Sequence, residues 1–454
     1  MRVSWNFSYG AELLKSADPV LLRGALAISR RLEKQGYQAY FAGGAVRDFL
    51  LGREIADIDI ATSAAPDVVE GLFPQTVGVG KQFGVIVVVL DQTNYEVATF
   101  RSDSGYEDGR HPSKVEFSDA RQDALRRDFT INSLFLNPLT GEVIDYNGGK
   151  EDLARRLIRT VGRPEQTLKE DKLRILRAIR FACQLGFEIE LDTYLHLDRF
   201  ADQLRRISWE RIRDELLKIL TGPDPGRGLK LMFDTGILDT ILPEVAAMDG
   251  VAQPPQFHPE GDVLEHTRLL FSRSRCRSQT LALATLLHDV GKPPTFKVKE
   301  RIRFDGHAEL GAEMAGRICR RLRLSNDIVD GVVDLVKDHL RFIHVKEMRE
   351  STLKRFLRRE NVDDHLELHR LDCLASHGDL SNYDFCRKKL LELGEETLRP
   401  ARLISGHDLI KLGLEPGPLF SEILNTVEDR QLEGSLISKK EALDWVKTHY
   451  LEQR

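Results

Sequence analysis

Two adjacent glycines and a closely spaced pair of aspartates constrain this chain more than any other feature. Gly43 and Gly44 come shortly before Arg47, and Asp57 and Asp59 follow in a strand-like run. A glycine turn can approach a phosphate closely because no Cβ obstructs it, and an arginine can donate two hydrogen bonds to phosphate oxygens. Side chains two residues apart on a strand leave the same face, and paired carboxylates repel unless a cation such as Mg²⁺ lies between them. The segment therefore predicts a phosphate loop beside a metal-binding strand.

The length of the chain indicates several folded domains. A chain of 454 residues exceeds the size at which one core stops growing, so two to four domains are expected. The five cysteines include no Cys-x-x-Cys pair, which argues against a disulfide framework or a zinc ribbon and suits the reducing cytoplasm. We find no apolar run typical of a signal peptide or a membrane span, so no membrane partner is expected.

The first third of the chain alternates strand and helix patterns. Apolar runs predict strands at 37–41, 55–61, 85–90, 95–100, 115–117, 134–137 and 143–145. Pro66 suits the first turn of a helix that ends near Phe73. We therefore expect an α+β head with a mixed sheet over residues 25–148.

Strand signals vanish after about residue 150, and helical patterns continue to the C-terminus. Glycine and proline breaks near residues 221–226, 253–255 and 400 mark the expected boundaries. The prediction is a series of all-helical domains after the head, at 149–252, 256–390 and 400–454.

A third carboxylate, Glu96, lies in the strand predicted at 95–100. Beside Asp57 and Asp59 it would complete a set able to hold two metal ions. The alternative is a glutamate that only faces solvent. The polar segment 100–113 is predicted to be a long loop, either a lid beside the site or a surface loop.

The segment around residue 130 adds charge and hydrogen-bonding groups. Arg126 and Arg127 can neutralise triphosphate charge. Asp128 and Asn132 are four residues apart, so on a helix they would share a face able to contact a ribose hydroxyl.

Residues 170–181 predict a helix with one charged arc and one apolar arc. Asp171 and Arg174 lie on the charged arc with Arg177, where an acceptor and a donor fork stand side by side. Asp accepts from the exocyclic amine of cytosine or adenine, and Arg donates to a ring acceptor, so the pair could select these bases. The alternative is a surface ion pair, worth about 0.3–0.5 kcal/mol.

The same region is locally basic although the net charge of the chain is −5. Residues 155–180 carry nine Lys and Arg side chains, Arg180 among them, against three Asp and Glu. This balance suits an RNA backbone, although charge runs are most often solvated surfaces.

A second set of potential metal ligands follows in the helical part. Histidine and aspartate from separate helices can converge on one cation and leave a position open for water. The residues concerned are His266, His288, Asp289, His307, His339 and Asp372. The pair His288-Asp289 followed by Gly-Lys resembles the HD phosphohydrolase pattern. The alternative is a relic HD fold kept for packing or RNA contact.

The ordered motifs of the chain resemble a known family. The glycine loop and acidic pair look like the head of the DNA polymerase β nucleotidyltransferase superfamily. With the segment 126–133 and the motif Glu170-Asp171-x-x-Arg174, the chain resembles class II tRNA nucleotidyltransferases and bacterial poly(A) polymerases that carry a C-terminal HD domain.

The resemblance implies that the chain adds CTP and ATP to the 3′ end of tRNA with Mg²⁺. It implies metal-binding catalytic roles for Asp57, Asp59 and Glu96. It also implies nucleotide binding by Gly43, Gly44, Arg47, Arg126, Arg127, Asp128, Asn132, Asp171, Arg174, Arg177 and Arg180. For the HD cluster, histidine ligands favour Mn²⁺, Co²⁺ or Ni²⁺ over Mg²⁺.

Several alternatives stay open from the sequence. An enzyme that adds a poly(A) tail, only A or only CC would carry nearly the same head. An HD phosphohydrolase as the main activity, or a catalytically silent RNA-binding protein, belongs to other classes. The sequence leaves the oligomeric state open.

Overall fold

The computed structural model describes residues 17–106, 112–256, 258–274 and 278–451. The chain divides into two compact units, Met1–Pro243 and Glu244–Arg454, which are described one at a time. The mixed sheet and the helices that follow it up to residue 243 belong to the first unit.

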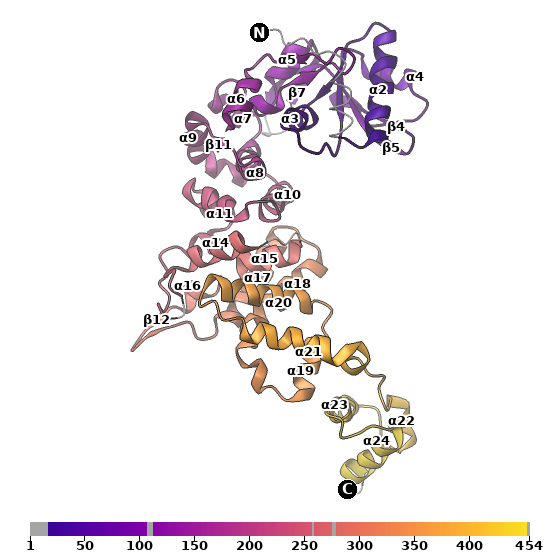
Figure 1. Cartoon of the computed structure of the whole chain (residues 1–454), viewed down its shortest axis with the longest axis vertical. Coiled ribbons are helices and arrows are strands. Elements are labelled where there is room, and N and C mark those ends of the chain that lie inside the picture. Colours follow the sequence, from indigo (N-terminus) through magenta and orange to yellow (C-terminus); the bar gives the residue numbers. More distant parts are fainter. Residues whose placement is uncertain (1–16, 107–111, 257, 275–277, 452–454) are drawn as a thin grey trace. The chain divides into compact units, whose positions relative to one another are not determined.

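A mixed sheet forms the core of the head (Figure 1). Its seven described strands have the order β3-β4-β5-β2-β1-β8-β9. β2 and β5 run parallel, and the other neighbouring strands are antiparallel. The bounds are β1 (Ala39–Ala42), β2 (Asp59–Thr62), β3 (Thr76–Gly80), β4 (Val85–Leu90), β5 (Thr93–Thr99), β8 (Phe135–Leu136) and β9 (Val143–Ile144). The mixed sheet predicted from the sequence is therefore confirmed.

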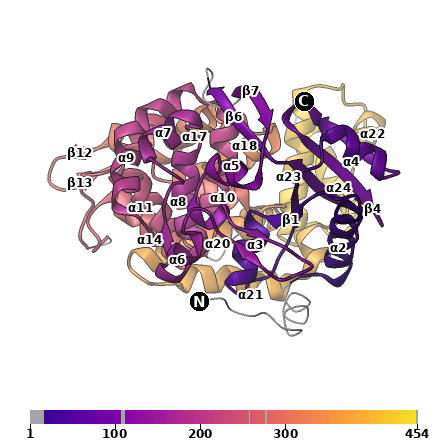
Figure 2. The ribbon, with the colours of Figure 1, turned by 90° about the horizontal axis from the view of Figure 1, so that it is seen from above.

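Helices cover both faces of this sheet. α2 (Pro19–Lys34) and α4 (Pro66–Leu72) pack together beside β4 and β5 (Figures 1 and 2). Asp18 starts α2 by accepting hydrogen bonds from the first free backbone amides, at 2.7 Å from Val20 N and 3.1 Å from Leu21 N. On the other face, α5 (Ala120–Leu125) packs its alanines against Phe100 and Phe135. A short helix, α3 (Gly44–Leu50), follows β1 directly.

The head differs from the sequence prediction in three places. Most of the predicted loop 100–113 is a hairpin, β6 (Arg101–Tyr106) and β7 (Pro112–Phe117), and residues 107–111 lie outside the described part. β3 was not predicted, because its two glycines weaken the strand signal. β2 begins at Asp59 rather than residue 55, so Asp57 precedes the strand.

The rest of the first unit is mainly helical. Its helices are α6 (Gly149–Arg155), α7 (Pro164–Glu170), α8 (Arg174–Leu185), α9 (Leu191–Phe200), η3 (Ala201–Arg206), α10 (Trp209–Leu220), α11 (Pro225–Asp234) and α12 (Ile237–Ile241), and α13 (Pro243–Ala246) spans the division. A two-residue parallel pair, β10 (Leu157–Ile158) with β11 (Glu188–Ile189), corrects the expectation that strands end at residue 150.

The second unit is also mainly helical. Its helices are α14 (Val263–Arg273), α15 (Gln279–Leu287), α16 (Lys292–Thr295), α17 (His307–Arg321), α18 (Asn326–Asp338), η4 (His339–Glu347), α19 (Glu350–Leu357), α20 (Val362–Ala375), α21 (Ser381–Leu398), α22 (Gly406–Lys411), α23 (Pro418–Leu432), α24 (Lys439–Val446) and η5 (Lys447–Leu451). A second short hairpin joins β12 (Lys297–Val298) to β13 (Ile302–Arg303). Leu270, Leu281, Leu335 and Leu371 form the core between α14, α15, α18 and α20. No helix in the described part of the chain is both long and apolar enough to cross a membrane.

Candidate active site and a second metal-binding cluster

A cavity of about 600 Å³ lies in the first unit where β1, α3, α8 and the start of β2 meet. Thirteen of the predicted nucleotide- and metal-binding residues line it. They are Gly43, Gly44, Arg47, Asp57, Asp59, Arg126, Arg127, Asp128, Asn132, Asp171, Arg174, Arg177 and Arg180. Tertiary folding thus brings together side chains that are far apart in the sequence.

The glycine loop forms the N-terminal end of α3. Gly43 caps this helix with φ of 67°, a left-handed conformation that glycine adopts without strain. A Cβ at Gly43 would lie 3.3 Å from Arg127 Nη1 and 3.8 Å from Asp59 Oδ2. The missing side chain therefore keeps open the space between the loop, the arginine and the acidic pair.

Three carboxylates gather beside this loop. Asp59 begins β2, and the parallel register that sets Ile60 opposite Val97 places Glu96 next to Asp59. Desolvation by the cavity walls, and then repulsion from Asp57 and Glu96, raise the pKa of Asp59 to about 6. Glu96 does not line the cavity, although its charge reaches Asp59. A divalent cation would relieve this repulsion, so the donor set fits a metal site.

Two of the predicted phosphate-binding arginines share a buried aspartate that the sequence analysis did not identify. Asp123 accepts from Arg126 Nε at 2.9 Å and from Arg127 Nη2 at 3.1 Å. Its i, i+3 and i, i+4 spacing to the arginines was the available signal. Asp123 thereby fixes both guanidinium groups at the cavity wall.

Arg47 is also held by neighbours and is nearly fully buried. It donates to both carboxylate oxygens of Asp48, at 3.0 and 2.7 Å, and to Asn132 Oδ1 at 2.8 Å. The ring of Phe181 lies 5.2 Å from its guanidinium carbon. A phosphate would therefore meet a guanidinium that is already oriented.

Asp128 and Asn132 contact each other but do not share a helix face, which corrects the prediction. α5 ends at Leu125, and Asn132 lies in a 3-10 turn, η2 (Thr130–Asn132). Asn132 Nδ2 donates to Asp128 Oδ1 at 3.1 Å, and Arg177 Nε donates to Asp128 Oδ2 at 2.9 Å. Burial alone would raise the pKa of Asp128, but Arg177 holds it well below its usual range.

The predicted helix 170–181 is broken at the proposed base-selecting pair. α7 ends at Glu170, Asp171 is extended with φ of −132°, and α8 begins at Arg174. The continuous charged arc expected from the sequence is therefore wrong, although Asp171, Arg174 and Arg177 all line the cavity. Lys172 and Leu173 form a turn between α7 and α8, so Asp171 and Arg174 do not lie on one continuous helix.

Asp171 and Arg174 are each held by other partners. Both carboxylate oxygens of Asp171 lie 3.2 Å from Arg211 Nη2. Arg174 donates to the carbonyl oxygens of Thr167 at 3.0 Å and Arg126 at 2.6 Å. Arg180 pairs with Glu215 at 2.9 Å, so part of the basic zone is neutralised within the protein.

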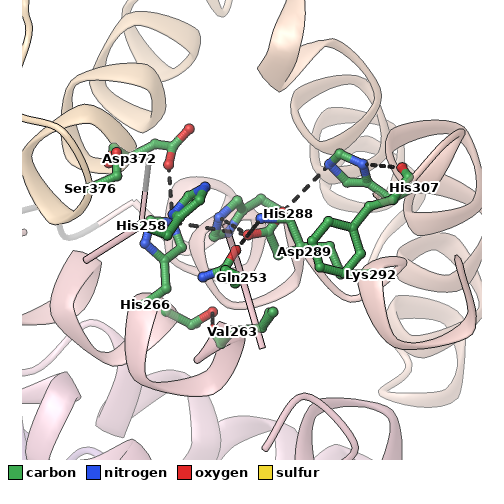
Figure 3. A network of polar contacts seen from close by, with 12 residues as sticks. Gln253, His258, Val263, His266, His288, Asp289, Lys292, His307, Asp372 and Ser376 are labelled. Atoms are coloured by element: carbon green, nitrogen blue, oxygen red, sulfur yellow. Dashed lines mark hydrogen bonds and ion pairs between the residues drawn. The ribbon is translucent and has the colours of Figure 1, made fainter. Parts of the chain in front are cut away.

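The six predicted HD residues converge in the second unit, and Figure 3 labels all of them except His339. Potential ligand atoms of His266, His288 and Asp372 lie within 4.8 Å of one another, and so do those of Asp289, His307 and His339. The residues come from α14, the end of α15, α17, the end of α18 and α20. Folding brings all six together around Asp289.

Three of the histidines are oriented in the same way. The Nδ1 atoms of His288, His307 and His339 lie 2.9, 2.8 and 2.6 Å from the carbonyl oxygens three residues earlier. Each Nδ1–H therefore donates to the backbone and leaves the Nε2 lone pair free for a metal ion. The Nε2 atoms lie 3.2, 3.7 and 3.9 Å from Asp289 carboxylate oxygens.

The charge pattern fits a cation at this cluster. Burial lowers the pKa of His339 to about 4, so its imidazole is neutral at pH 7. Burial also opposes the charge on His266, but hydrogen bonds with Asp372 and Glu260 raise its pKa to about 9. The buried Nε2 atoms of His288 and His307 have no hydrogen-bond partner in the described part of the chain. The neutral imidazole of His339 and the unpaired Nε2 atoms of His288 and His307, beside the buried Asp289 and the partly exposed Asp372, suit a transition metal, whereas His266 is protonated at pH 7 and hydrogen-bonded to Asp372.

Four neighbours of the cluster were not identified from the sequence. His258 and Glu260 form a further group with His266. Lys292 lies 2.7 Å from Asp289 Oδ2 and donates to Gln253 Oε1 at 2.6 Å. Lys292 was noted only as part of the Gly-Lys pair. Gln253 lies in the predicted break at 253–255, whereas His258 and Glu260 lie inside the predicted domain 256–390 and were not recognised there.

The cluster opens into a cavity of about 750 Å³. Asp289, His307, His339 and Asp372 form its polar wall. Lys292, Asp379, Asn382 and three further histidines add polar groups to the lining, and Phe304, Leu340 and Ile343 add apolar surface. The cavity is large enough for a small ligand, with the metal-binding cluster on one side.

Family models match three segments of the chain. They are described as the Poly A polymerase head domain over residues 39–159, a probable RNA- and SrmB-binding site of polymerase A over 186–248, and the HD domain over 262–375. The head and HD matches, with the residue groups above, imply the use of divalent metal ions.

A solved structure shares the architecture over nearly the whole chain. The crystal structure of a Bacillus stearothermophilus CCA-adding enzyme in complex with CTP has a TM-score of 0.72 and 28% identity, covering 96% of this chain and 99% of that chain. A Thermotoga maritima CCA-adding enzyme complexed with tRNA, at 22% identity and a TM-score of 0.63, shares the fold.

Relatives of known sequence agree with the structural match. CCA-adding enzymes from Bacillus pumilus and Geobacillus thermodenitrificans are 48% and 49% identical over 218 and 223 residues, where the alignment spans about half of each relative (54% and 55%). The CCA-adding enzyme of Geobacillus sp. (strain WCH70) is 36% identical over 434 residues, which are 93% of this chain and 96% of that protein. With this match over 93% of its length, the chain belongs to the family of CCA-adding enzymes.

Proposed function

We propose that this chain adds C, C and A to the 3′ end of tRNA, using CTP and ATP with Mg²⁺. The observation that carries the proposal is the single cavity in which the glycine loop, three arginines and two of the three clustered carboxylates face the proposed base-selecting residues. Full-length relatives described as CCA-adding enzymes favour this activity over poly(A), A-only or CC-only addition. They also disfavour an HD hydrolase as the main activity.

Asp57, Asp59 and Glu96 would hold divalent ions, which lower the pKa of the primer hydroxyl and bind triphosphate oxygens when present. Gly43 and Gly44 bring backbone close to the triphosphate, and the anchored Arg126 and Arg127 neutralise its charge. The 3′-hydroxyl oxygen of the tRNA bonds to the α-phosphorus and loses its proton to solvent. The bond to the bridging oxygen breaks, and pyrophosphate leaves.

The base would be selected by hydrogen bonding to protein side chains. Asp171 accepts from the exocyclic amine of cytosine or adenine, and Arg174 donates to a ring acceptor. Uracil and guanine present a carbonyl in place of that amine, so Asp171 would oppose them. In the absence of nucleotide, both carboxylate oxygens of Asp171 contact Arg211. When Asp171 accepts a hydrogen bond from the base, its carboxylate is shared between the base and Arg211, so the contact with Arg211 weakens.

The test is incorporation of labelled CTP and ATP into tRNA that ends at the discriminator base. We expect two C residues and one A residue per tRNA, with little incorporation from UTP or GTP. A long A tail, or a product that stops after CC, would contradict full CCA addition.

A second function is favoured by the HD cluster. We infer that this site hydrolyses a phosphoester at an RNA end, with a 2′,3′-cyclic phosphate as the substrate, because such an end blocks the hydroxyl that the head requires. The supporting observation is that His288, His307 and His339 share one orientation, with Nδ1 on a backbone carbonyl and Nε2 3.2–3.9 Å from an Asp289 carboxylate oxygen. Water would bond to phosphorus while one ribose oxygen leaves and takes a proton.

The inferred hydrolase is tested by cleavage of a 2′,3′-cyclic nucleotide by the purified chain. Mn²⁺, Co²⁺ and Ni²⁺ are expected to support cleavage better than Mg²⁺, because imidazole ligands suit these ions. Failure with every metal would leave the HD part as a scaffold.

A further inference from the structure

The ring of Phe181 lies among three of the arginines that line the head cavity. The guanidinium carbons of Arg47, Arg177 and Arg180 stand over this ring, at 5.2, 5.3 and 4.2 Å from its centre. Distances within about 6 Å are those of cation–π contacts, in which the negative face of an aromatic ring attracts a cation. One aromatic side chain therefore contacts three cations of the proposed nucleotide site.

Phe181 itself belongs to the wall of this cavity. It lies in α8, it is only 6% exposed, and it lines the cavity beside the arginines. A second ring, that of Phe129, meets it edge-on with 5.7 Å between the ring centres and is fully buried. Among the described residues, none places a cation over the Phe129 ring, and Phe129 does not line the cavity. The two neighbouring rings thus differ in their contact with charge.

Each of the three arginines also has a carboxylate partner. The pairs are Arg47 with Asp48, Arg177 with Asp128, and Arg180 with Glu215. A guanidinium group has five N–H donors and two flat faces. In the described contacts, Arg47 uses three donors on Asp48 and Asn132, and Arg177 uses two on Asp128. Both groups therefore keep donors for a ligand in the cavity.

The ring supplies a constraint that the carboxylates do not. The charges of Arg177 and Arg47 both oppose the charge of Arg180, so the three groups repel one another. A carboxylate at one edge of a guanidinium group still allows the group to swing about that edge. Contact of the flat face with an aromatic ring fixes the position of the face as well. Phe181 provides this contact for all three groups at once.

We propose that Phe181 is a positioning residue for nucleotide binding, whose ring holds Arg47, Arg177 and Arg180 with their free donors toward the triphosphate and ribose. The inference rests on the proposed nucleotide addition, to which it adds a side chain that has no charge and no polar atom. CTP and ATP share the triphosphate and the ribose. The ring should therefore affect the binding of both nucleotides equally and leave the choice of base unchanged.

The experiment weakens the negative face of the Phe181 ring and leaves its packing nearly unchanged. Phenylalanine with one, two or three ring fluorines is introduced at position 181 of the full chain, because fluorine withdraws electron density from the ring face. We expect KM for CTP and for ATP to rise stepwise with the number of fluorines, reaching about tenfold with three. The preference for CTP and ATP over UTP and GTP should stay as in the wild type, in contrast to Asp171→Ala.

The matched control places the same fluorinated residues at Phe129, where KM should not change because no cation of the described chain stands over that ring. Phe181→Tyr keeps an aromatic face and should stay close to the wild-type KM, whereas Phe181→Leu should raise KM at least as much as three fluorines. A constant KM throughout the fluorine series at position 181 would overturn the proposal. An equal rise at position 129 would overturn it too, because packing would then explain both. If Phe181→Leu does not fold, the fluorine series decides alone.

A failure of the proposed function is distinguishable from a failure of this inference. Dissociation constants of CTP and ATP are measured by calorimetry on the same variants without tRNA. If the wild-type chain binds both nucleotides but does not add C, C and A, only the proposed function fails, and a stepwise rise of the dissociation constants would still support the role of Phe181. If the wild-type chain binds neither nucleotide, both are overturned.

Discussion

At the scale of single residues, the carboxylates of the head are poised to take up a cation. Desolvation by the cavity walls, and then repulsion from Asp57 and Glu96, raise the pKa of Asp59 to about 6. The nearby arginines are already bound by Asp123 or Asp48 and cannot fully neutralise the group. In this proposal, a bound metal ion supplies the positive charge that balances the three carboxylates.

Asp59→Asn is expected to lower the rate of CTP incorporation by more than about a hundredfold. Loss of groups that only orient metal ligands already costs about 10–100-fold, so loss of a ligand itself should cost more. The measurement is incorporation at saturating Mg²⁺, with unfolding followed in parallel. Near wild-type transfer by this variant would contradict the metal-binding role of Asp59.

Asp59 should also make stability depend on pH when divalent ions are removed. Its folded pKa of about 6 exceeds the ordinary value of 3.8, so between these values the folded state binds more protons than the unfolded state. The free energy of unfolding should therefore fall as pH rises from about 4 to about 6. The difference between wild type and Asp59→Asn in chelator isolates this group. Added Mg²⁺ should stabilise the wild type at pH 7 but not at pH 4.

Asp171→Ala is expected to reduce discrimination against UTP and GTP by about 1–3 kcal/mol, because the acceptor for the exocyclic amine is lost. The control Asp171→Asn keeps one acceptor oxygen and should retain part of the selectivity. The measurement is kcat/KM for each of the four nucleoside triphosphates. A variant that is slower but equally selective would show that the base is chosen elsewhere.

At the scale of secondary-structure elements, breaks between helices aim the functional side chains. The turn after Glu170 separates α7 from α8, so Asp171 and Arg174 approach the cavity from two elements. In the second unit, Gly291 lets the start of α16 pass close to α17, which carries His307. A Cβ at Gly291 would lie 2.2 Å from the carbonyl oxygen of His307 and 2.7 Å from the amide of Gly311.

Gly291→Ala should therefore lower the free energy of unfolding of this unit by about 1–3 kcal/mol, the usual cost of inserting a methyl group into packed structure. It should also weaken Mn²⁺ binding, because α17 must move and His307 moves with it. Gly417→Ala is the matched control, since no atom lies within 4 Å of its Cβ position. Equal stability of the two variants in denaturant would contradict the close approach.

At the scale of the whole molecule, the two proposed sites lie in different compact units. The head cavity belongs to the unit that ends at Pro243, and the HD cluster belongs to the unit that begins at Glu244. Each cluster is built from residues of its own unit. The two activities should therefore respond separately to mutation and to the choice of metal ion.

His288→Ala combined with Asp289→Ala should abolish phosphoester cleavage and leave CCA addition largely unchanged. The paired removal takes away a ligand and the carboxylate toward which the other imidazoles point. Both assays are run on the same preparation, with circular dichroism as the check on folding. Parallel loss of both activities in a folded protein would contradict separate sites, and cleavage equal to wild type would remove the HD assignment.

The sequence alone determined the features that a few consecutive residues encode. Alternating apolar residues placed most strands of the head, and the motif spacing identified the glycine loop, the acidic pair and the His-Asp pair. These signals are local because backbone hydrogen bonding, helix caps and turn geometry depend on near neighbours. Where a local signal was ambiguous, as for the polar strand at 101–106 and the break at Asp171, the prediction was wrong.

Only the tertiary structure decided which charged side chains hold one another. Arg177 meets Asp128, Arg211 meets Asp171, and His266 meets Asp372 across 49, 40 and 106 residues of sequence. Such pairs depend on which helices pack together, and that packing is driven by apolar contacts. The spacing of charged residues along the sequence therefore does not reveal the pairs. The raised pKa of Asp59 and the common orientation of the HD histidines arise in the same way, because each depends on groups that only folding brings within reach.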